Sequence, residues 1–168
     1  FGAINTLLGS EIAWFQNPNF ARFAVILVNL WLGFPYFYLI NSGAMQAIPS
    51  ELSEAASIDG ASPRQIFSKI TLPLLLKIVS PLLIASFAFN FNNFNLIYLL
   101  TGGGPRNELD GEMAGATDIL ISYTYRIAFG TNVQDLGFAS AISVVIFFIV
   151  AAISLYGVRK SKVLDTFS

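Results

Sequence analysis

The chain has 168 residues, of which 55% are hydrophobic and only 11% are charged. Soluble domains usually carry about a quarter charged residues, so this composition indicates a membrane protein. There is no cysteine and no histidine, which excludes disulfides, thiol chemistry and the commonest metal ligand and acid–base catalyst. A net charge of −1 gives no indication of nucleic-acid binding. The opening residues FGAINTLLG lack a signal-like pattern, and we expect the chain to be part of a longer protein.

Three apolar segments are each long enough to cross a bilayer as a helix, which takes about 20 residues. They cover about residues 22–48, 74–100 and 136–158, and predict an all-α membrane protein. Six lysines and arginines flank one side of these segments and three flank the other. The positive-inside rule then places loop 49–73 and the C-terminus in the cytosol. Loop 101–135 is expected outside, with GATDILISYTYRIAF, residues 115–129, as a short interfacial helix.

The stretch between the first two spans predicts two short helices joined by a turn. Ser50 is expected to cap the first helix and Gly60 to end it. Ser62 and Gln65 have the spacing of a capping box, with proline at the first helical position, and Pro73 is expected to end the second helix. On patterning alone, this elbow is either a plain connection or a small-residue knob that docks another protein.

Polar side chains recur inside two of the predicted spans, where an unsatisfied amide costs several kcal/mol. Each set follows helical spacing, and the two sets lie at similar depth, roughly 18–28 Å from the cytosolic end. Asn29 and Tyr36 form the first set with Leu32 and Gly33, which lie on the same stripe of the helix. Ser86, Asn90 and Asn93 form the second set, with Phe89 beside them. They predict either hydrogen bonding between helices or an uncharged cavity that suits hydroxyl groups. The absence of carboxylates argues against a metal ion or a cationic substrate.

The elbow sequence EAASIDGASPRQIFSKITLP resembles the cytosolic loop of ABC-importer membrane subunits, in which E-A-A is followed after three residues by glycine. The resemblance implies that the first helix is a coupling helix that enters a cleft of the ATP-hydrolysing subunit. The matching positions that it assigns to this docking are Glu54, Ala55, Ala56, Asp59 and Gly60.

Three further stretches, VNLWLGFPYFYLI, PLLIASFAFNFNNFNLIYLLTGGGP and ISYTYRIAFG, resemble the larger membrane subunits of maltose/maltodextrin importers. The similarity covers nearly the whole chain and departs mainly at residues 106–115 and 130–133. It implies the C-terminal part of a type I importer permease core in a bacterial inner membrane, preceded by further spans and an external domain. It also implies that the eight residues of the two polar sets contact the sugar.

The implied partners are a homologous second membrane subunit, two copies of an ABC ATPase, an external sugar-binding protein and the lipid bilayer. The chain has no G-x-x-x-x-G-K-[ST] motif, so ATP and Mg²⁺ are expected on the ATPase, with no cofactor, catalytic residue or metal ligand here. The alternative is an importer subunit for trehalose, another oligosaccharide or glycerol phosphate. An intramembrane enzyme lacks an evident base, and an ion-coupled carrier lacks the expected charged or inverted-repeat features.

Overall fold

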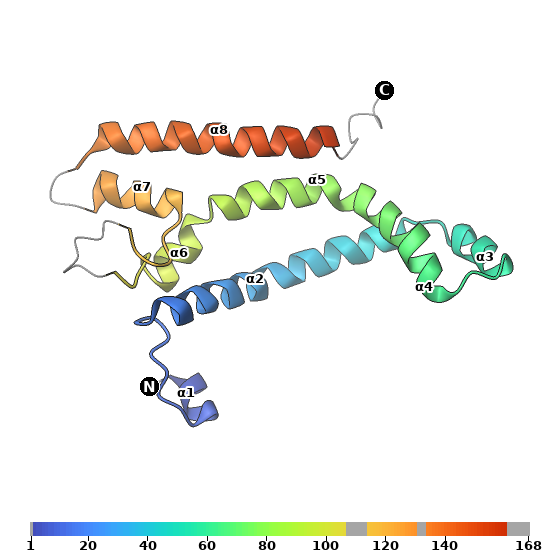
Figure 1. Ribbon diagram of the computed structural model, residues 1–168, viewed down its shortest axis with the longest axis horizontal. Helices are drawn as coiled ribbons and strands as arrows, with labels where there is room; N and C mark the ends of the chain where they lie inside the picture. Colours follow the sequence, from blue (N-terminus) through green and yellow to red (C-terminus); the bar gives the residue numbers. More distant parts are fainter. Residues whose placement is uncertain (1, 107–113, 131–133, 161–168) are drawn as a thin grey trace. The chain divides into compact units, whose positions relative to one another are not determined.

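The computed structural model describes residues 2–106, 114–130 and 134–160, and this part of the chain is helical without strands (Figure 1). The elements are α1 (Ala3–Leu8), α2 (Pro18–Gln46), α3 (Ser50–Ile58), α4 (Pro63–Ile66), the π-helical segment η1 (Phe67–Thr71), α5 (Leu72–Phe91), α6 (Phe94–Leu100), α7 (Leu120–Phe129) and α8 (Leu136–Lys160). The chain forms two compact units, of which unit 1 holds residues 1–31 and 92–147 and unit 2 holds residues 32–91 and 148–168.

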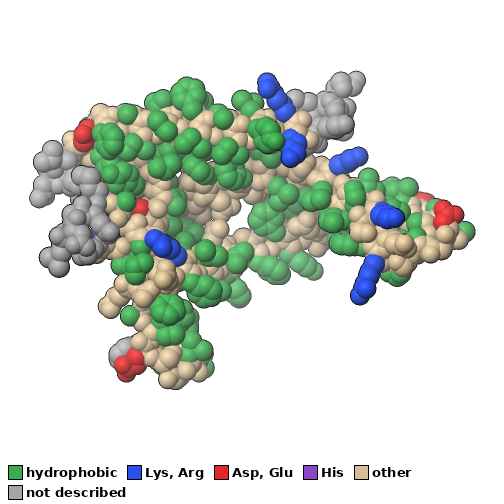
Figure 2. Space-filling view, in the orientation of Figure 1, with side chains coloured by type: hydrophobic (Ala, Val, Ile, Leu, Met, Phe, Trp, Pro, Cys, Tyr) green, Lys and Arg blue, Asp and Glu red, His purple; other side chains and the backbone are tan. Residues whose placement is uncertain are grey.

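Three helices are long and apolar enough to cross a membrane: Pro18–Gln46, the continuous helix Pro63–Phe91, and Leu136–Lys160. The first and third agree with the predicted spans to within a few residues. Pro35 lies inside α2, which continues past it to Gln46. Many large apolar side chains of these helices are exposed, and they cover much of the face in view in Figure 2, as expected for helices that face lipid or other helices.

The second predicted span, residues 74–100, is not one helix. The helix α5 ends at Phe91, and a new short helix, α6, begins at Phe94. Asn93 causes the break, because its side-chain oxygen accepts a hydrogen bond from the backbone N–H of Leu96 at 3.3 Å and so caps α6. Asparagine side chains compete with the helix for backbone hydrogen bonds, which favours them at caps over helix interiors.

The prediction that Pro73 ends the elbow's second helix is also wrong. The helix runs through it, and η1 occupies the turn immediately before. Pro73 has no N–H for the carbonyl of Lys69, and in a regular α-helix its ring would press on that carbonyl. The wider π turn relieves this conflict, and the N–H of Leu72 bonds to the carbonyl of Phe67, five residues back.

In unit 2 the elbow elements pack on one another, with α3 against α4 and η1, and η1 against α5 (Figure 1). The helices α5 and α8 approach closely at Gly157. A Cβ atom at this position would lie 3.0 Å from Cγ1 of Ile84, so the missing side chain is what permits the approach.

In unit 1, α6 packs against α7 through aromatic rings. The ring of Tyr125 lies 4.7 Å from that of Phe94 and 5.6 Å from that of Tyr98. The helix α7 also buries the small polar residues Ser122 and Thr124. The helix predicted over residues 115–129 is therefore confirmed for Leu120–Phe129, whereas residues 115–119 are not helical. Residues 107–113 and 131–133 of the predicted loop, and Lys162 of the tail, lie outside the described residues.

Candidate functional site

The elbow is built from two capped helix ends. The helix α3 begins at Ser50 itself, after Pro49, so Ser50 is not the cap that the sequence predicted. The C-terminal end of α3 agrees with the prediction that Gly60 ends this helix, because Gly60 has a φ of +81°. The N–H of Gly60 bonds to the carbonyl of Ser57 at 3.1 Å, and the N–H of Ala61 bonds to that of Ala56 at 2.9 Å. This paired pattern is a Schellman motif, which requires the left-handed backbone that glycine adopts most readily.

The second half of the elbow begins with the predicted capping contact. The side-chain oxygen of Gln65 accepts a hydrogen bond from the backbone N–H of Ser62 at 2.8 Å. It also accepts one from the hydroxyl of Ser62 at 3.0 Å. With Pro63 at the first helical position, these contacts fix where α4 starts. Hydrogen bonds therefore fix the turn between α3 and α4 at both ends, and the elbow has a defined conformation.

The elbow presents its predicted docking residues to the outside. None of the residues of α3, α4 or η1 is buried. Glu54, Ala55, Asp59 and Gly60 are exposed, and Ala56 is half-buried. The side chain of Ile58 is 87% exposed beside them. Acidic side chains gather at the tip of the elbow (Figure 2). A small, exposed, partly apolar face with unpaired carboxylates suits insertion into a cleft of another protein.

The eight residues predicted to contact a sugar are divided between the two units. Asn29 and Asn93 belong to unit 1, and the other six belong to unit 2. Within unit 2 no hydrogen bond or ring contact joins the α2 residues of the set to those of α5. Tyr36 is 48% exposed and Phe89 is 70% exposed. The shared cavity stays a prediction. The spacing argument behind it needs correction, because Asn90 and Asn93 lie on opposite sides of the helix break and not on one continuous helix.

The side-chain amide of each of these two asparagines forms one hydrogen bond with a neighbouring backbone group. The side-chain nitrogen of Asn90 donates to the carbonyl of Ser86 at 2.8 Å, which leaves its oxygen as an acceptor. The oxygen of Asn93 is occupied by the cap of α6, which leaves its NH₂ group as a donor. The oxygen of Asn90 and the NH₂ group of Asn93 offer the acceptor and the donor that match the two roles of a hydroxyl group.

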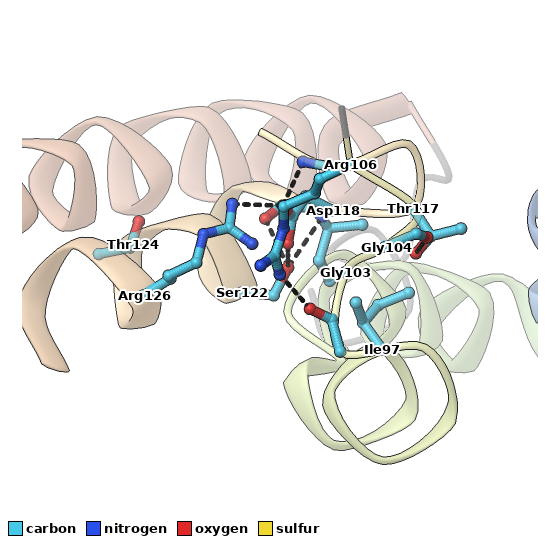
Figure 3. Close-up of polar contacts among 12 residues, drawn as sticks. Ile97, Gly103, Gly104, Arg106, Thr117, Asp118, Ser122, Thr124 and Arg126 are labelled. Carbon is cyan, nitrogen blue, oxygen red and sulfur yellow. Dashed lines mark hydrogen bonds and ion pairs between the residues drawn. The ribbon is translucent and has the colours of Figure 1, made fainter. Parts of the chain in front are cut away.

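A polar cluster that the sequence did not predict joins the loop after α6 to the start of α7 (Figure 3). Its centre is Asp118, whose side chain is 4% exposed and forms an ion pair with Arg126, which is 17% exposed. The carboxylate also accepts from the N–H of Gly115 at 2.7 Å and from the hydroxyl of Ser122 at 2.9 Å. Several charge-assisted donors offset the cost of burying this charge.

A second part of the cluster ties the glycine-rich loop to the same region. The hydroxyl oxygens of Thr101 and Thr117 are 2.6 Å apart, and the hydroxyl of Thr117 donates to the carbonyl of Gly104 at 2.6 Å. Arg106 donates to the carbonyl of Gly102. The cluster therefore holds the loop 101–106 in a fixed position against α7.

Sequence analysis missed this cluster because its partners are separated by up to 16 residues and follow no helical period. One signal was available: Asp118 stands just before a helix, where a carboxylate is favoured by the helix dipole. The described residues contain no group of three or more histidine, cysteine or acidic side chains that could hold a metal ion. Asp118 is fully engaged by donors, so we assign the cluster a structural role.

The chain was compared with known proteins. Residues 2–163 match the family described as binding-protein-dependent transport system inner membrane component. Curated relatives include the maltose/maltodextrin transport system permease protein MalF of Vibrio parahaemolyticus, which is 53% identical over 97% of this chain. The protein of the same name from Salmonella typhimurium is 53% identical over 96% of the chain, and that from Photorhabdus laumondii is 52% identical over 97%. In each case the match covers 32% of the relative, so the chain spans about a third of its length.

Proposed function

The chain belongs to the family of binding-protein-dependent transport system inner membrane components, and from this premise we propose that it is part of the membrane subunit of an ATP-driven importer for maltose or maltodextrin. The family and the three apolar helices make it a multi-pass protein of the inner membrane. The main support for the sugar is the 53% identity, over nearly the whole chain, to relatives named as maltose/maltodextrin permeases.

In this proposal the elbow docks an ABC ATPase on the cytosolic side, and the C-terminus lies on the same side. Glu54 and the small face of α3 enter a cleft of the ATPase, where ATP and Mg²⁺ are bound. Its capped ends and its packing on η1 and α5 let the elbow move as a rigid lever. Closure of two ATPase copies then opens the cavity outward, so that an external binding protein can release its sugar. The second membrane subunit completes the path.

The sugar site of the proposal is the set Asn29, Leu32, Gly33, Tyr36, Ser86, Phe89, Asn90 and Asn93. Its neutral amides and exposed rings suit the hydroxyl groups and the apolar face of a sugar ring. Hydrogen bonds to neutral groups contribute about 1 kcal/mol each, which fits a substrate that must also leave. Trehalose, another oligosaccharide or glycerol phosphate is the alternative cargo.

The docking role is tested by replacing Glu54 with Trp in the complete transporter, with Glu51→Trp as the matched control on the first turn of the same exposed helix. A residue that anchors an interface contributes about 2 kcal/mol or more, so sugar uptake should fall by about 30-fold in Glu54→Trp. Uptake in Glu51→Trp should stay within about twofold of wild type. Both variants should reach the membrane in wild-type amounts. Wild-type uptake by Glu54→Trp would remove the docking role.

The cargo is tested by an uptake panel of maltose, maltotriose, trehalose and glycerol phosphate. The site itself is tested with Asn90→Leu and Asn93→Ser, because serine keeps an oxygen to cap α6 while removing the amide donor. Both variants should lose maltose uptake and keep the stimulation of ATP hydrolysis by the binding protein. Asn95→Leu, which alters an exposed amide outside the set, is the control. Unchanged maltose uptake in both site variants would show that these amides do not contact the cargo.

A further inference from the structure

Unit 1 contains a cavity of about 430 Å³ where the start of α2 meets the loop that precedes α7. Pro18 and Arg22 of α2 form one wall. Arg106 and residues 114–116 form the other. The proposed transport function uses none of these residues, although Gly115 also donates its N–H to the carboxylate of Asp118 at 2.7 Å, so the cavity borders the polar cluster.

The backbone of Ala116 forms hydrogen bonds that position both arginines of the cavity. The Nε of Arg22 donates to the carbonyl of Ala116 at 2.9 Å. The N–H of Ala116 donates in turn to the carbonyl of Pro105 at 2.9 Å, and Arg106 is the next residue. Arg106 is held by its own bond to the carbonyl of Gly102. Each guanidinium has five N–H donors, so most of these donors are left for another acceptor.

The positive charge of the cavity is not balanced within the described residues. Among residues 2–106, 114–130 and 134–160, the ion pair joins Asp118 to Arg126, and neither Arg22 nor Arg106 has a carboxylate partner within these residues. The Nε of Arg106 is buried without a hydrogen-bond partner. A buried donor on a charged group is costly unless an acceptor reaches it, so this arginine points to an anion.

The N-terminal end of α2 adds to the positive electrostatic potential of the cavity, but few of its backbone N–H groups are free to bind an anion. The side-chain oxygen of Asn17 already accepts from the N–H groups of Asn19 and Phe20, at 2.9 and 3.4 Å. The N-terminal end of the helix dipole still favours negative charge nearby. Recognition of an anion here would therefore rest on the two guanidinium groups, whose planar donor forks match the oxygens of a phosphate.

The surroundings of the cavity indicate where such a phosphate comes from. Arg22 directly precedes the apolar run of α2, which begins at Phe23. Phe15, Phe20 and Phe23 are exposed, and the ring of Trp14 packs edge-on against Phe20 at 5.7 Å. Aromatic side chains gather at the level of lipid headgroups, and arginines at a span end reach the same level. The exposed aromatic and apolar surface beside the two arginines suits acyl chains.

We propose that this cavity binds the phosphate of an anionic phospholipid, with Arg22 and Arg106 on its oxygens and the acyl chains along the exposed surface of α2. The proposal depends on membrane insertion and not on the identity of the cargo.

The test is a titration of the complete transporter, purified in an uncharged detergent, with dioctanoyl phosphatidylglycerol, read as the shift in thermal unfolding temperature. Binding to the native state should raise this temperature saturably. A cationic side chain near a lipid surface contributes about 1 kcal/mol, or about fivefold in affinity, so Arg22→Gln with Arg106→Gln should need about 30-fold more lipid. Arg64→Gln, an exposed arginine of the elbow, should titrate like wild type.

Two further probes separate the sources of phosphate. Dioctanoylglycerol, which lacks the phosphate, should give no saturable shift, and inorganic phosphate at equal concentration should give less than a tenth of the effect. The pair Arg22→Lys with Arg106→Lys keeps the charge and should retain part of the lipid response, even if the glutamine pair does not assemble. Equal lipid response in wild type and in both double variants would overturn the site. An equal response to inorganic phosphate would overturn the assignment to a lipid.

Discussion

The substitution Gly103→Ala gives a sharp test of the polar cluster, because Gly103 is in contact with its buried carboxylate. The backbone of Gly103 has a φ of +84°, a region that costs an L-residue about 1–2 kcal/mol. A Cβ atom at this position would lie 2.6 Å from Cγ of Asp118. The side chain of Asp118 has little freedom to move, because Arg126, Ser122 and the N–H of Gly115 all hold it.

The neighbouring Gly102 is a matched control. Its φ is +58°, so an alanine there carries a similar backbone cost. A Cβ atom at Gly102 would meet nothing within 4 Å. The difference between the two variants therefore isolates the contact with Asp118. If that carboxylate is pushed off its partners, the loss of a buried ion pair costs about 3–5 kcal/mol. Gly102→Ala should cost about 1–2 kcal/mol, and Gly103→Ala about 4–7 kcal/mol.

The measurement is thermal unfolding of the complete transporter in detergent, together with the amount of subunit in the membrane. Gly103→Ala should lower the unfolding temperature clearly more than Gly102→Ala, and should reduce the amount in the membrane. A further substitution, Asp118→Ala, removes the obstacle and should make the additional cost of Gly103→Ala disappear. Equal effects of the two glycine substitutions in the wild-type background would refute the view that Asp118 is fixed by the cluster.

Two other outcomes follow from the packing in unit 2. Gly157→Leu should push α8 away from α5 and cost about 1–3 kcal/mol of stability in thermal unfolding. A side chain at Gly43 points into open space, so Gly43→Leu should be neutral or stabilising. Equal effects of the two substitutions would contradict the close approach of Gly157 to Ile84. Deleting Ser68 together with Pro73→Ala, which removes the ring that the π turn accommodates, should convert η1 into α-helix and keep the elbow in phase with α5. Deleting Leu83 should instead rotate the elbow by about 100°. Sugar uptake should persist in the first variant and be lost in the second, and loss of uptake in both would show that the π turn has another role.

The parts of the fold that were predicted correctly depend on local chemistry. Length and hydropathy were enough for the three apolar helices, because a run of about 20 apolar residues has few other ways to satisfy its backbone. The turn at Gly60 and the contact between Ser62 and Gln65 were predicted from residue types that act within three or four positions. In both cases the structure is decided by neighbours in the sequence.

The errors have the opposite origin. The helix break at residues 92–93 was missed because helical spacing alone does not reveal that an asparagine will cap a new helix. The continuation of the helix through Pro73 was missed because a π turn accommodates the missing N–H. The cluster at Asp118 depends on contacts between residues that are distant in sequence, such as Thr101 and Thr117.

The break in the helix changes the argument for the sugar site rather than removing it. In one continuous helix, Asn90 and Asn93 would each be free to satisfy both halves of the amide on the same helix or on a neighbour. With the break, Asn90 spends one donor on the carbonyl of Ser86 and Asn93 spends its acceptor on the N–H of Leu96. Each amide is thus fixed in orientation, and Asn90 keeps its oxygen and one N–H, whereas Asn93 keeps both N–H donors. Groups that are already oriented lose little entropy when they bind a hydroxyl. Asn93→Asp would keep the cap but exchange the free donor for an acceptor, so it should lose sugar uptake and keep α6. Asn93→Ala, which removes the cap at a cost of about 1 kcal/mol, should lose both uptake and stability of α6.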